Sequence, residues 1–186
     1  MSEEMLIRHC SPTLAGLKTA NLVNCPCPSV SELEQQLGRL SSTLNPKGVQ
    51  LEMLSAGNGM ALVYVVRPDR LEKDLGGEAG ELLCREGYPK GDAGECLRCL
   101  KRKLQSGGGF PHEIGLFLGY PPVDVAGFIR HRGQGCKCVG TWKVYGDEQA
   151  AKKTFAQYKK CTDVYERRLR EGYSVERLTV QGKLVN

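Results

Sequence analysis

Hydrophobic residues recur with two different periods along the chain, and each period predicts its own kind of element. Between Val30 and Leu44, leucines follow one another at spacings of three and four residues, as on one face of a helix. Residues 49–54 then alternate between hydrophobic and polar side chains, and residues 60–66 form a continuous hydrophobic run. The pattern predicts a helix and then a β-hairpin whose second strand is buried on both faces.

Shorter patterns and breaker residues predict the remaining elements. Ser11 and Pro12 favour the start of a helix, because serine caps a helix and proline fits its first position. The other predicted helices cover residues 71–75, 78–86, 92–105, 123–130 and 147–171. The other predicted strands cover residues 20–24, 114–120, 138–145 and 175–180.

These helices and strands predict an α/β fold, with α+β as the alternative. We expect a single layered domain over residues 1–186, in which helices pack on a mixed β-sheet of about four or five strands. The glycine-rich residues 106–109 are expected to form a flexible loop within this domain.

Composition narrows the class of protein. Of the 186 residues, 40% are hydrophobic and 25% are charged, and this balance excludes a disordered chain. No hydrophobic stretch approaches the roughly 18 residues of a membrane-spanning helix, and the acidic Glu3 and Glu4 are unlike the start of a signal peptide. We therefore expect a cytoplasmic protein without a membrane contact. Its net charge of +5 permits an anionic partner but falls short of the charge of a dedicated nucleic-acid-binding protein, so nucleic acid is not an expected partner.

Nine cysteines are the most distinctive feature of the composition. In a reducing cytoplasm they are expected as thiols, metal ligands or reactive groups rather than as disulfides. Cys96 and Cys99 have the two-residue gap of a metal-binding pair, but their place in a predicted helix also suits two core residues. Cys136 and Cys138 follow a basic segment and are the candidate metal ligands, with a structural role in a tight turn as the alternative. Iron, zinc or haem is the candidate cofactor.

His112 and Glu113 follow the glycine-rich loop at the start of a predicted strand. An imidazole there titrates near neutral pH, so His112 is a candidate general acid or base. Adjacent residues of a strand point to opposite faces, so Glu113 is not expected to act with His112 as a pair. Glu113 is assigned to ligand binding instead, together with Tyr120 and Trp142.

Lys18 and Cys10 are the candidate chemical groups near the start of the chain. Lys18 lies among small residues, where a lysine can contact a phosphate or a carboxylate, and an ordinary surface lysine is the alternative. Cys10 follows His9 and is a candidate nucleophile or ligand. The sequence contains no phosphate-binding glycine loop, no zinc-peptidase helix motif and no serine nucleophile elbow.

The last long predicted helix is strongly basic. Residues 152–170 contain seven basic and two acidic residues. The basic residues are Lys152, Lys153, Lys159, Lys160, Arg167, Arg168 and Arg170. Such a helix presents either an ordinary solvated face or a surface that binds an anionic partner.

Four segments carry distinctive motifs: HCSPTLAGLK at residues 9–18, HEIGLFLGYP at 112–121, CKCVGTWKVY at 136–145 and YKKCT at 158–162. With them, the chain resembles a family of uncharacterised proteins from anaerobic, mostly clostridial, bacteria over about residues 8–173. The resemblance implies no assigned activity and no agreed catalytic residues. It does imply redox or metal-related work, with a flavodoxin-like protein as a redox partner.

These observations lead to two hypotheses. In the first, a cytoplasmic protein binds a small or anionic ligand, or a redox-active metal cofactor, in a pocket formed by residues 9–18, the His112 loop and the Cys136 loop. In an enzymatic version of it, His112 is the acid or base, Lys18 holds an anionic group and a cysteine is the nucleophile or ligand. In the second, a non-catalytic regulatory or interaction protein binds an anionic partner through its basic C-terminal helix.

Overall fold

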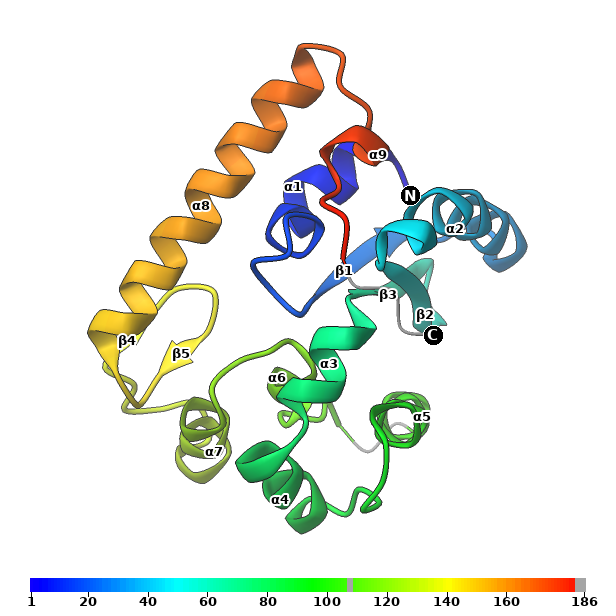
Figure 1. Ribbon diagram of the computed structural model, residues 1–186. Coiled ribbons are helices and arrows are strands. Elements are labelled where there is room, and N and C mark those ends of the chain that lie inside the picture. The colour runs from blue at the N-terminus through cyan, green and yellow to red at the C-terminus, as the bar shows by residue number, and fades with distance from the viewer. Residues whose placement is uncertain (107–108, 183–186) are drawn as a thin grey trace. The chain divides into compact units, whose positions relative to one another are not determined.

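The structure is a computed structural model that describes residues 1–106 and 109–182 (Figure 1). The chain divides into two compact units. The first comprises residues 1–71 and the chain from residue 160 onwards, and the second comprises residues 72–159. The single domain expected over the whole chain stays a prediction. Gly107 and Gly108, in the expected flexible loop, lie outside the described residues.

The first unit is built on a three-stranded antiparallel sheet in the order β1-β3-β2. Its strands are β1 (Ala20–Pro26), β2 (Gln50–Gly57) and β3 (Met60–Val66). Its helices include α1 (Glu3–Leu14), α2 (Val30–Leu44), the short 3-10 helix η1 (Asn45–Lys47) and α9 (Val175–Leu178). The predicted helix over 30–44 and the hairpin after it are confirmed. Asn58 and Gly59 form the hairpin turn with φ angles of 50° and 73°, which suit the twist of the paired strands.

The core of the first unit lies between one face of the sheet and helices α1, α2 and α9 (Figure 1). Strands β1 and β3 contribute alternate residues, as period two requires. The buried residues from the sheet are Val23, Cys25, Ala61, Val63 and Val65, and those from the helices are Leu6, Ile7, Cys10, Leu14, Leu33, Leu37, Leu44 and Val175. Tyr64 and Val66, on the other face of β3, are also buried, which confirms that this strand is covered on both faces.

The second unit is mainly helical. Its elements are the end of α3 (Pro68–Asp74), α4 (Gly77–Arg85), α5 (Ala93–Gln105), α6 (Ile114–Phe117), α7 (Pro122–His131), β4 (Cys138–Val139), β5 (Lys143–Val144) and the first half of α8 (Glu148–Arg170). The predicted starts of α5 and α8 are confirmed. Asp92 accepts a hydrogen bond from the amide of Glu95 at 2.7 Å, and Asp147 accepts one from the amide of Ala150 at 3.0 Å.

The fold is thus mixed α+β, which confirms the α+β alternative. Among the described residues, nine α-helices accompany a three-stranded sheet and a two-stranded hairpin. All the strand pairings described are antiparallel, so the mixed sheet that we expected is not what these strands form.

Two predicted strands are helical instead. Residues 114–120 contain α6, in which the amide of Leu118 donates to the carbonyl of Ile114 at 3.2 Å. A short hydrophobic run indicates burial rather than backbone geometry, and residues 114–118 are all buried. Residues 175–180 contain α9, because the Ser174 side chain accepts a hydrogen bond from the amide of Arg177 at 3.3 Å and so caps a helical turn.

Two other elements differ in extent from the prediction. α1 begins at Glu3, since Ser2 caps it by accepting a hydrogen bond from the amide of Met5 at 3.2 Å. Pro12 therefore lies near the end of this helix and not at its start, where its missing amide removes only one helical hydrogen bond. Residues 138–145 form a hairpin of two short strands and not one strand.

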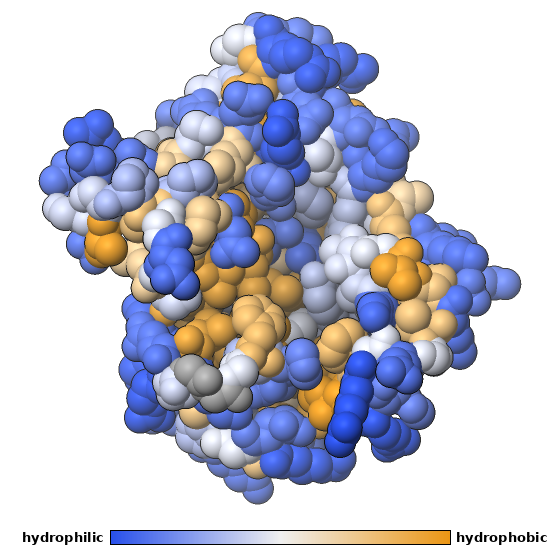
Figure 2. All heavy atoms as spheres, turned by 180° about the vertical axis from the view of Figure 1, so that it is seen from behind, coloured by the Kyte–Doolittle hydropathy of each residue, from blue (hydrophilic) through white to orange (hydrophobic). Residues whose placement is uncertain are grey.

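Hydrophilic side chains cover much of the face drawn in Figure 2, with hydrophobic patches between them. The large hydrophobic side chains that are exposed in the described part of the chain are Leu17, Val30, Met60, Phe110, Val123, Val139 and Val180. No described helix is both long enough and hydrophobic enough to cross a membrane.

Arg67 follows β3 directly, and only 2% of the residue is exposed. Its guanidinium donates to the carbonyls of Thr13 and Leu14 at 2.6 Å each and to that of Val180 at 2.7 Å. A longer hydrogen bond of 3.4 Å reaches the carbonyl of Lys47. Thr13 and Leu14 end α1, and their carbonyls also accept hydrogen bonds from the amides of Gly16 and Val180, so Arg67 adds a charged donor to each and complements the negative end of the helix dipole.

Arg67→Met is expected to lower the free energy of unfolding by about 1–3 kcal/mol, because it removes four hydrogen bonds from a charged donor, while the carbonyls of Thr13, Leu14 and Lys47 keep a backbone amide donor. Arg67→Lys keeps the charge but not the planar fork, so a smaller loss is expected. Denaturant unfolding followed by circular dichroism measures both variants. The exposed Arg39 provides the control, since Arg39→Met should change stability by at most about 0.5 kcal/mol. Equal losses at positions 39 and 67 would contradict this role of Arg67.

Candidate functional site

Cys10 and Lys18 are both buried in the interior of the first unit, with 0% of Cys10 and 3% of Lys18 exposed. Burial raises the pKa of the Cys10 thiol to about 12, and the nearby Lys18 offsets part of this rise. Burial also lowers the pKa of the Lys18 amine to about 8. Cys10 is therefore a protonated thiol at neutral pH, which is the unreactive form of the nucleophile predicted there.

A turn after α1 explains the burial of Lys18. The amides of Leu17 and Lys18 both donate to the carbonyl of Pro12, at 2.8 and 3.0 Å. Gly16 permits this turn with a φ angle of 72°, which favours glycine. The chain then enters β1 at Ala20. Lys18 is thus held between the end of a helix and the start of a strand, which excludes the ordinary surface lysine considered above.

His112 is an exposed residue of the second unit. It lies in the turn before α6, and its ring meets that of Phe128 edge-on with the centroids 4.9 Å apart. Phe128 belongs to α7, so the imidazole packs on a neighbouring helix. The acid–base role of His112 stays a prediction.

Glu113 is buried and accepts two hydrogen bonds on the same oxygen. The Tyr88 hydroxyl donates to its Oε1 at 3.0 Å, and the Lys103 ammonium donates to it at 2.9 Å. Lys103 also donates to the carbonyl of Glu86 at 2.6 Å. Burial and the neighbouring Glu113 raise the pKa of Tyr88, so its phenol remains protonated and acts as a donor. The assignment of Glu113 to ligand binding stays a prediction, and one of its oxygens already serves an internal ion pair.

Tyr120 and Trp142 form an aromatic cluster with Phe155 of α8. The rings of Tyr120 and Trp142 stack with centroids 4.9 Å apart, and Phe155 meets Trp142 edge-on at 4.6 Å. The Tyr120 hydroxyl donates to the carbonyl of Thr141 at 3.2 Å, and burial raises the pKa of Tyr120 to about 12. A Cβ at Gly140 would lie 2.2 Å from the Phe155 ring, so only glycine admits the ring at this position of the hairpin.

Asp124 holds this hairpin on α7. Its Oδ2 accepts a hydrogen bond from the indole of Trp142 at 2.6 Å. Its Oδ1 accepts two more, from the amides of Tyr145 at 2.8 Å and Gly146 at 2.7 Å. Only 3% of Asp124 is exposed, and three donors compensate for the burial of its charge. The assignment of Tyr120 and Trp142 to ligand binding remains untested, and their contacts explain a structural role.

Cys136 and Cys138 are half-buried at the start of the hairpin. Among residues 1–106 and 109–182, no group of three or more histidine, cysteine, aspartate and glutamate side chains could hold a metal ion. Cys136 and Cys138 therefore have no third ligand of these types among the described residues with which to hold a metal ion. Iron, zinc and haem stay predictions without support from the described side chains.

The predicted pocket draws on both units. Residues 9–18 belong to the first unit, whereas His112 and the Cys136 loop belong to the second. The convergence of these segments stays a prediction. Within each unit, Cys10 and Lys18 are close enough to affect each other's pKa, and Tyr120 stacks on Trp142.

Sequence reasoning missed three charged residues that organise these clusters. Arg67 and Asp124 are almost fully buried, and Lys103 forms the ion pair with Glu113. A weak indication existed for Arg67, because a charged residue directly after a buried strand is unusual and suggests a buried polar contact. No such indication existed for Asp124 and Lys103. Each lies in a predicted helix, where charged residues are usually exposed.

The fold and these clusters define a mixed α+β protein in which most of the candidate residues are engaged in packing and internal hydrogen bonds. The chain belongs to the family described as "Protein of unknown function (DUF3793)", which matches residues 6–179. Searches of curated proteins and of solved structures found no match. Family membership agrees with the resemblance to uncharacterised proteins and adds no activity.

Lys18→Met is expected to stabilise the protein at neutral pH. With a pKa of about 8 in the folded chain against an ordinary 10.5, Lys18 binds fewer protons folded than unfolded between these pH values. The contribution of Lys18 to the free energy of unfolding therefore rises with pH across this range. At lower pH the amine is charged, and its burial lowers the free energy of unfolding. The free energy of unfolding of the variant should exceed that of wild type by about 1–3 kcal/mol at pH 7, and this difference should shrink towards pH 10.5. Unfolding free energies across this range test it, and a gap that does not change with pH would contradict it.

Asp124→Ala is expected to lower the free energy of unfolding by about 2–4 kcal/mol, because it leaves three donors without an acceptor. Asp124→Asn keeps one oxygen for the two amides, so it should lose about half as much. Trp142 is the single tryptophan, so its fluorescence reports the hairpin directly during unfolding in urea. The exposed Glu78→Ala is the matched control and should leave emission unchanged. Equal losses of unfolding free energy in the Asn and Ala variants would contradict the separate roles of the two carboxylate oxygens.

Proposed function

We propose that this protein is a non-catalytic interaction protein that binds the acidic surface of a partner protein through the outer face of α8. The observation that carries this proposal is a row of exposed basic side chains, here called the basic stripe. It consists of Lys152, Lys153, Lys159, Lys160, Arg167 and Arg170. Spacings of seven and eight residues keep these side chains on one face of a helix, and the stripe runs for about 27 Å at 1.5 Å per residue.

The opposite face of α8 is hydrophobic and accounts for the direction of the stripe. Its residues are the buried Ala151 and the half-buried Phe155, Tyr158, Thr162, Tyr165 and Leu169. Because these side chains recur every three or four residues, they fix one face of the helix towards the protein. The basic stripe is left on the solvent side.

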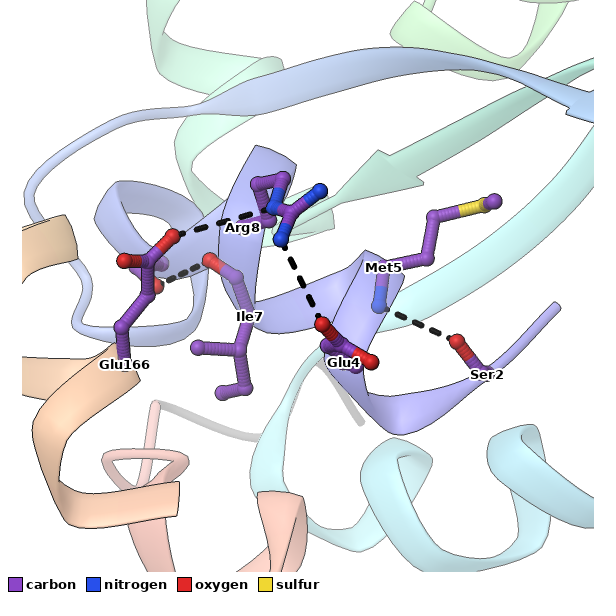
Figure 3. A network of polar contacts seen from close by, with 7 residues as sticks. Ser2, Glu4, Met5, Ile7, Arg8 and Glu166 are labelled. Atoms are coloured by element: carbon purple, nitrogen blue, oxygen red, sulfur yellow. Dashed lines mark hydrogen bonds and ion pairs between the residues drawn. The ribbon is translucent and has the colours of Figure 1, made fainter. Parts of the chain in front are cut away.

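Acidic neighbours neutralise only part of the stripe. Lys152 pairs with Glu148 at 2.6 Å, at the start of the helix. Glu166 lies next to the stripe, but Arg8 of α1 takes this carboxylate at 3.9 Å (Figure 3). Arg8 also contacts Glu4 at 3.3 Å, so it is itself shared between two acids.

Three cations of the stripe make no ion pair with any residue that the structure describes: Lys153, Lys160 and Arg170. Uncompensated charge of one sign on one helix face attracts a partner of opposite charge and accelerates its association.

An acidic protein fits the stripe better than a nucleic acid does. The aromatic residues of α8 lie on its inner face, so the stripe offers no platform on which bases could stack.

The proposal places this interaction in the cytoplasm of an anaerobic bacterium, as the resemblance of the motifs suggests. A flavodoxin-like redox protein is one candidate partner. The cofactor-binding hypothesis draws no comparable support, because Cys10, Glu113 and Trp142 are engaged in internal contacts.

The triple variant Lys153→Ala, Lys160→Ala and Arg170→Ala tests the proposal. These side chains make no internal ion pair, so folding should not change. Labelled poly-glutamate serves as an acidic polypeptide probe, with binding followed by fluorescence anisotropy at several salt concentrations. At about 0.5 kcal/mol for each lost charge contact, the variant should bind about tenfold more weakly than wild type.

A matched variant removes the same charge elsewhere: Arg39→Ala, Lys73→Ala and Arg130→Ala, all exposed. It should bind the probe as wild type does. Equal weakening in both triple variants would reduce the effect to net charge and overturn the proposal. Tighter, stripe-dependent binding to random-sequence duplex DNA than to poly-glutamate would overturn the choice of an acidic protein.

A further inference from the structure

A groove of about 510 Å³ runs along α4 in the second unit. Its volume falls within the range of about 300–1,000 Å³ that small-molecule sites occupy. Cys84 of α4 and Cys96 of α5 both line it, with Gly77 at one edge. The space around Gly77 is open, because a Cβ built there would meet nothing within 4 Å. The groove thus presents two thiols from different helices to one small ligand.

The two thiols differ in exposure. Cys84 is half-buried, whereas only 4% of Cys96 is exposed. The Cys96 thiol donates to the carbonyl of Pro89, which lies 3.6 Å away and belongs to another residue that lines the groove. Burial raises the pKa of Cys96, and the neighbouring Cys99, Cys84, Asp92 and Glu95 add to this rise. One thiol is therefore accessible and a second is sheltered in the lining of the same groove.

The charges along the groove favour an anionic ligand. Arg85 and Glu81 both line it and form an exposed ion pair at 3.7 Å. Lys90 lines it as well and makes no ion pair within the described residues, which leaves the groove with a net positive charge. A carboxylate-bearing ligand gains from this charge.

We propose that Cys84 and Cys96 form a dithiol that reduces an anionic low-molecular-weight disulfide. In the first step, the Cys84 thiolate attacks one sulfur of the disulfide, a mixed disulfide forms on Cys84, and one thiolate leaves and takes up a proton. In the second step, the Cys96 thiolate attacks the Cys84 sulfur, an internal disulfide forms, and the second thiolate leaves and takes up a proton. The protein loses two electrons and two protons, and the disulfide becomes two thiols.

This site is independent of the basic stripe. It also differs from a pair formed by Cys96 and Cys99, because Cys99 does not line the groove. The order of attack follows from access, since a ligand reaches Cys84 before it can reach Cys96.

Reaction of the fully reduced protein with oxidised glutathione tests the proposal, with peptide mapping by mass spectrometry. Wild type should form a disulfide between Cys84 and Cys96 and release two glutathione molecules. Cys96→Ser should stop at one glutathione on Cys84, and Cys84→Ser should lose at least about nine-tenths of both products. Closure should speed up from pH 7 to pH 9, because the raised pKa of Cys96 keeps its thiolate scarce at neutral pH.

Cys99→Ser is the matched control, because it removes a buried cysteine one helical turn away. It should still close the disulfide at the wild-type rate. A disulfide between Cys96 and Cys99, or glutathione bound mainly at Cys136 or Cys138, would overturn the proposal. Undiminished reaction of Cys84→Ser would overturn it as well.

Discussion

The first unit depends on one buried cation, the guanidinium of Arg67. Burying a cation without partners costs several kcal/mol, and the cost falls only when hydrogen-bond acceptors surround it. Here the acceptors are backbone carbonyls from the end of α1, from η1 and from the segment after α9. These segments are far apart in sequence, so the guanidinium is satisfied only once the sheet, the first helix and the C-terminal segment have met. The geometry of one side chain thus makes the folding of the first unit cooperative.

In the second unit, a buried anion joins separate segments in the same way as the buried cation does in the first. The carboxylate of Asp124 collects an indole and two backbone amides, and so fixes the position of a hairpin that has only two residues in each strand. So short a hairpin is not stable alone in water. Glu113 acts in a similar way when it joins Tyr88 to Lys103. Buried acidic residues are therefore used here to hold irregular segments in place, whether they were assigned to ligand binding, as Glu113 was, or not, as with Asp124.

Local sequence patterns predicted most of the helices and strands. The helix over residues 30–44, the hairpin that ends in β3 and the caps at Asp92 and Asp147 follow from periodicity and from side-chain to backbone hydrogen bonds, which are both local. α6 and α9 were misassigned because a short hydrophobic run and a brief alternation fit either kind of backbone. The burial of Lys18 is invisible in sequence, since it depends on a turn that brings the end of α1 against β1. The same holds for the groove of Cys84 and Cys96, whose spacing of twelve residues predicts no contact.

The basic stripe and the groove of Cys84 and Cys96 share one physical feature, because both keep reactive or charged side chains within reach of solvent. Side chains satisfied inside the protein are unavailable to partners, so function is to be sought where charge or thiol remains unused. α8 buries one residue, Ala151, out of 23 and keeps its lysines in water, whereas the groove keeps Cys84 within reach of solvent. Neither feature helps the fold, because exposed like charges repel one another and a half-buried thiol packs less well than a buried one. Residues that contribute little to stability keep their chemistry available for binding, and this reasoning is the common basis of the two proposals, the stripe and the groove.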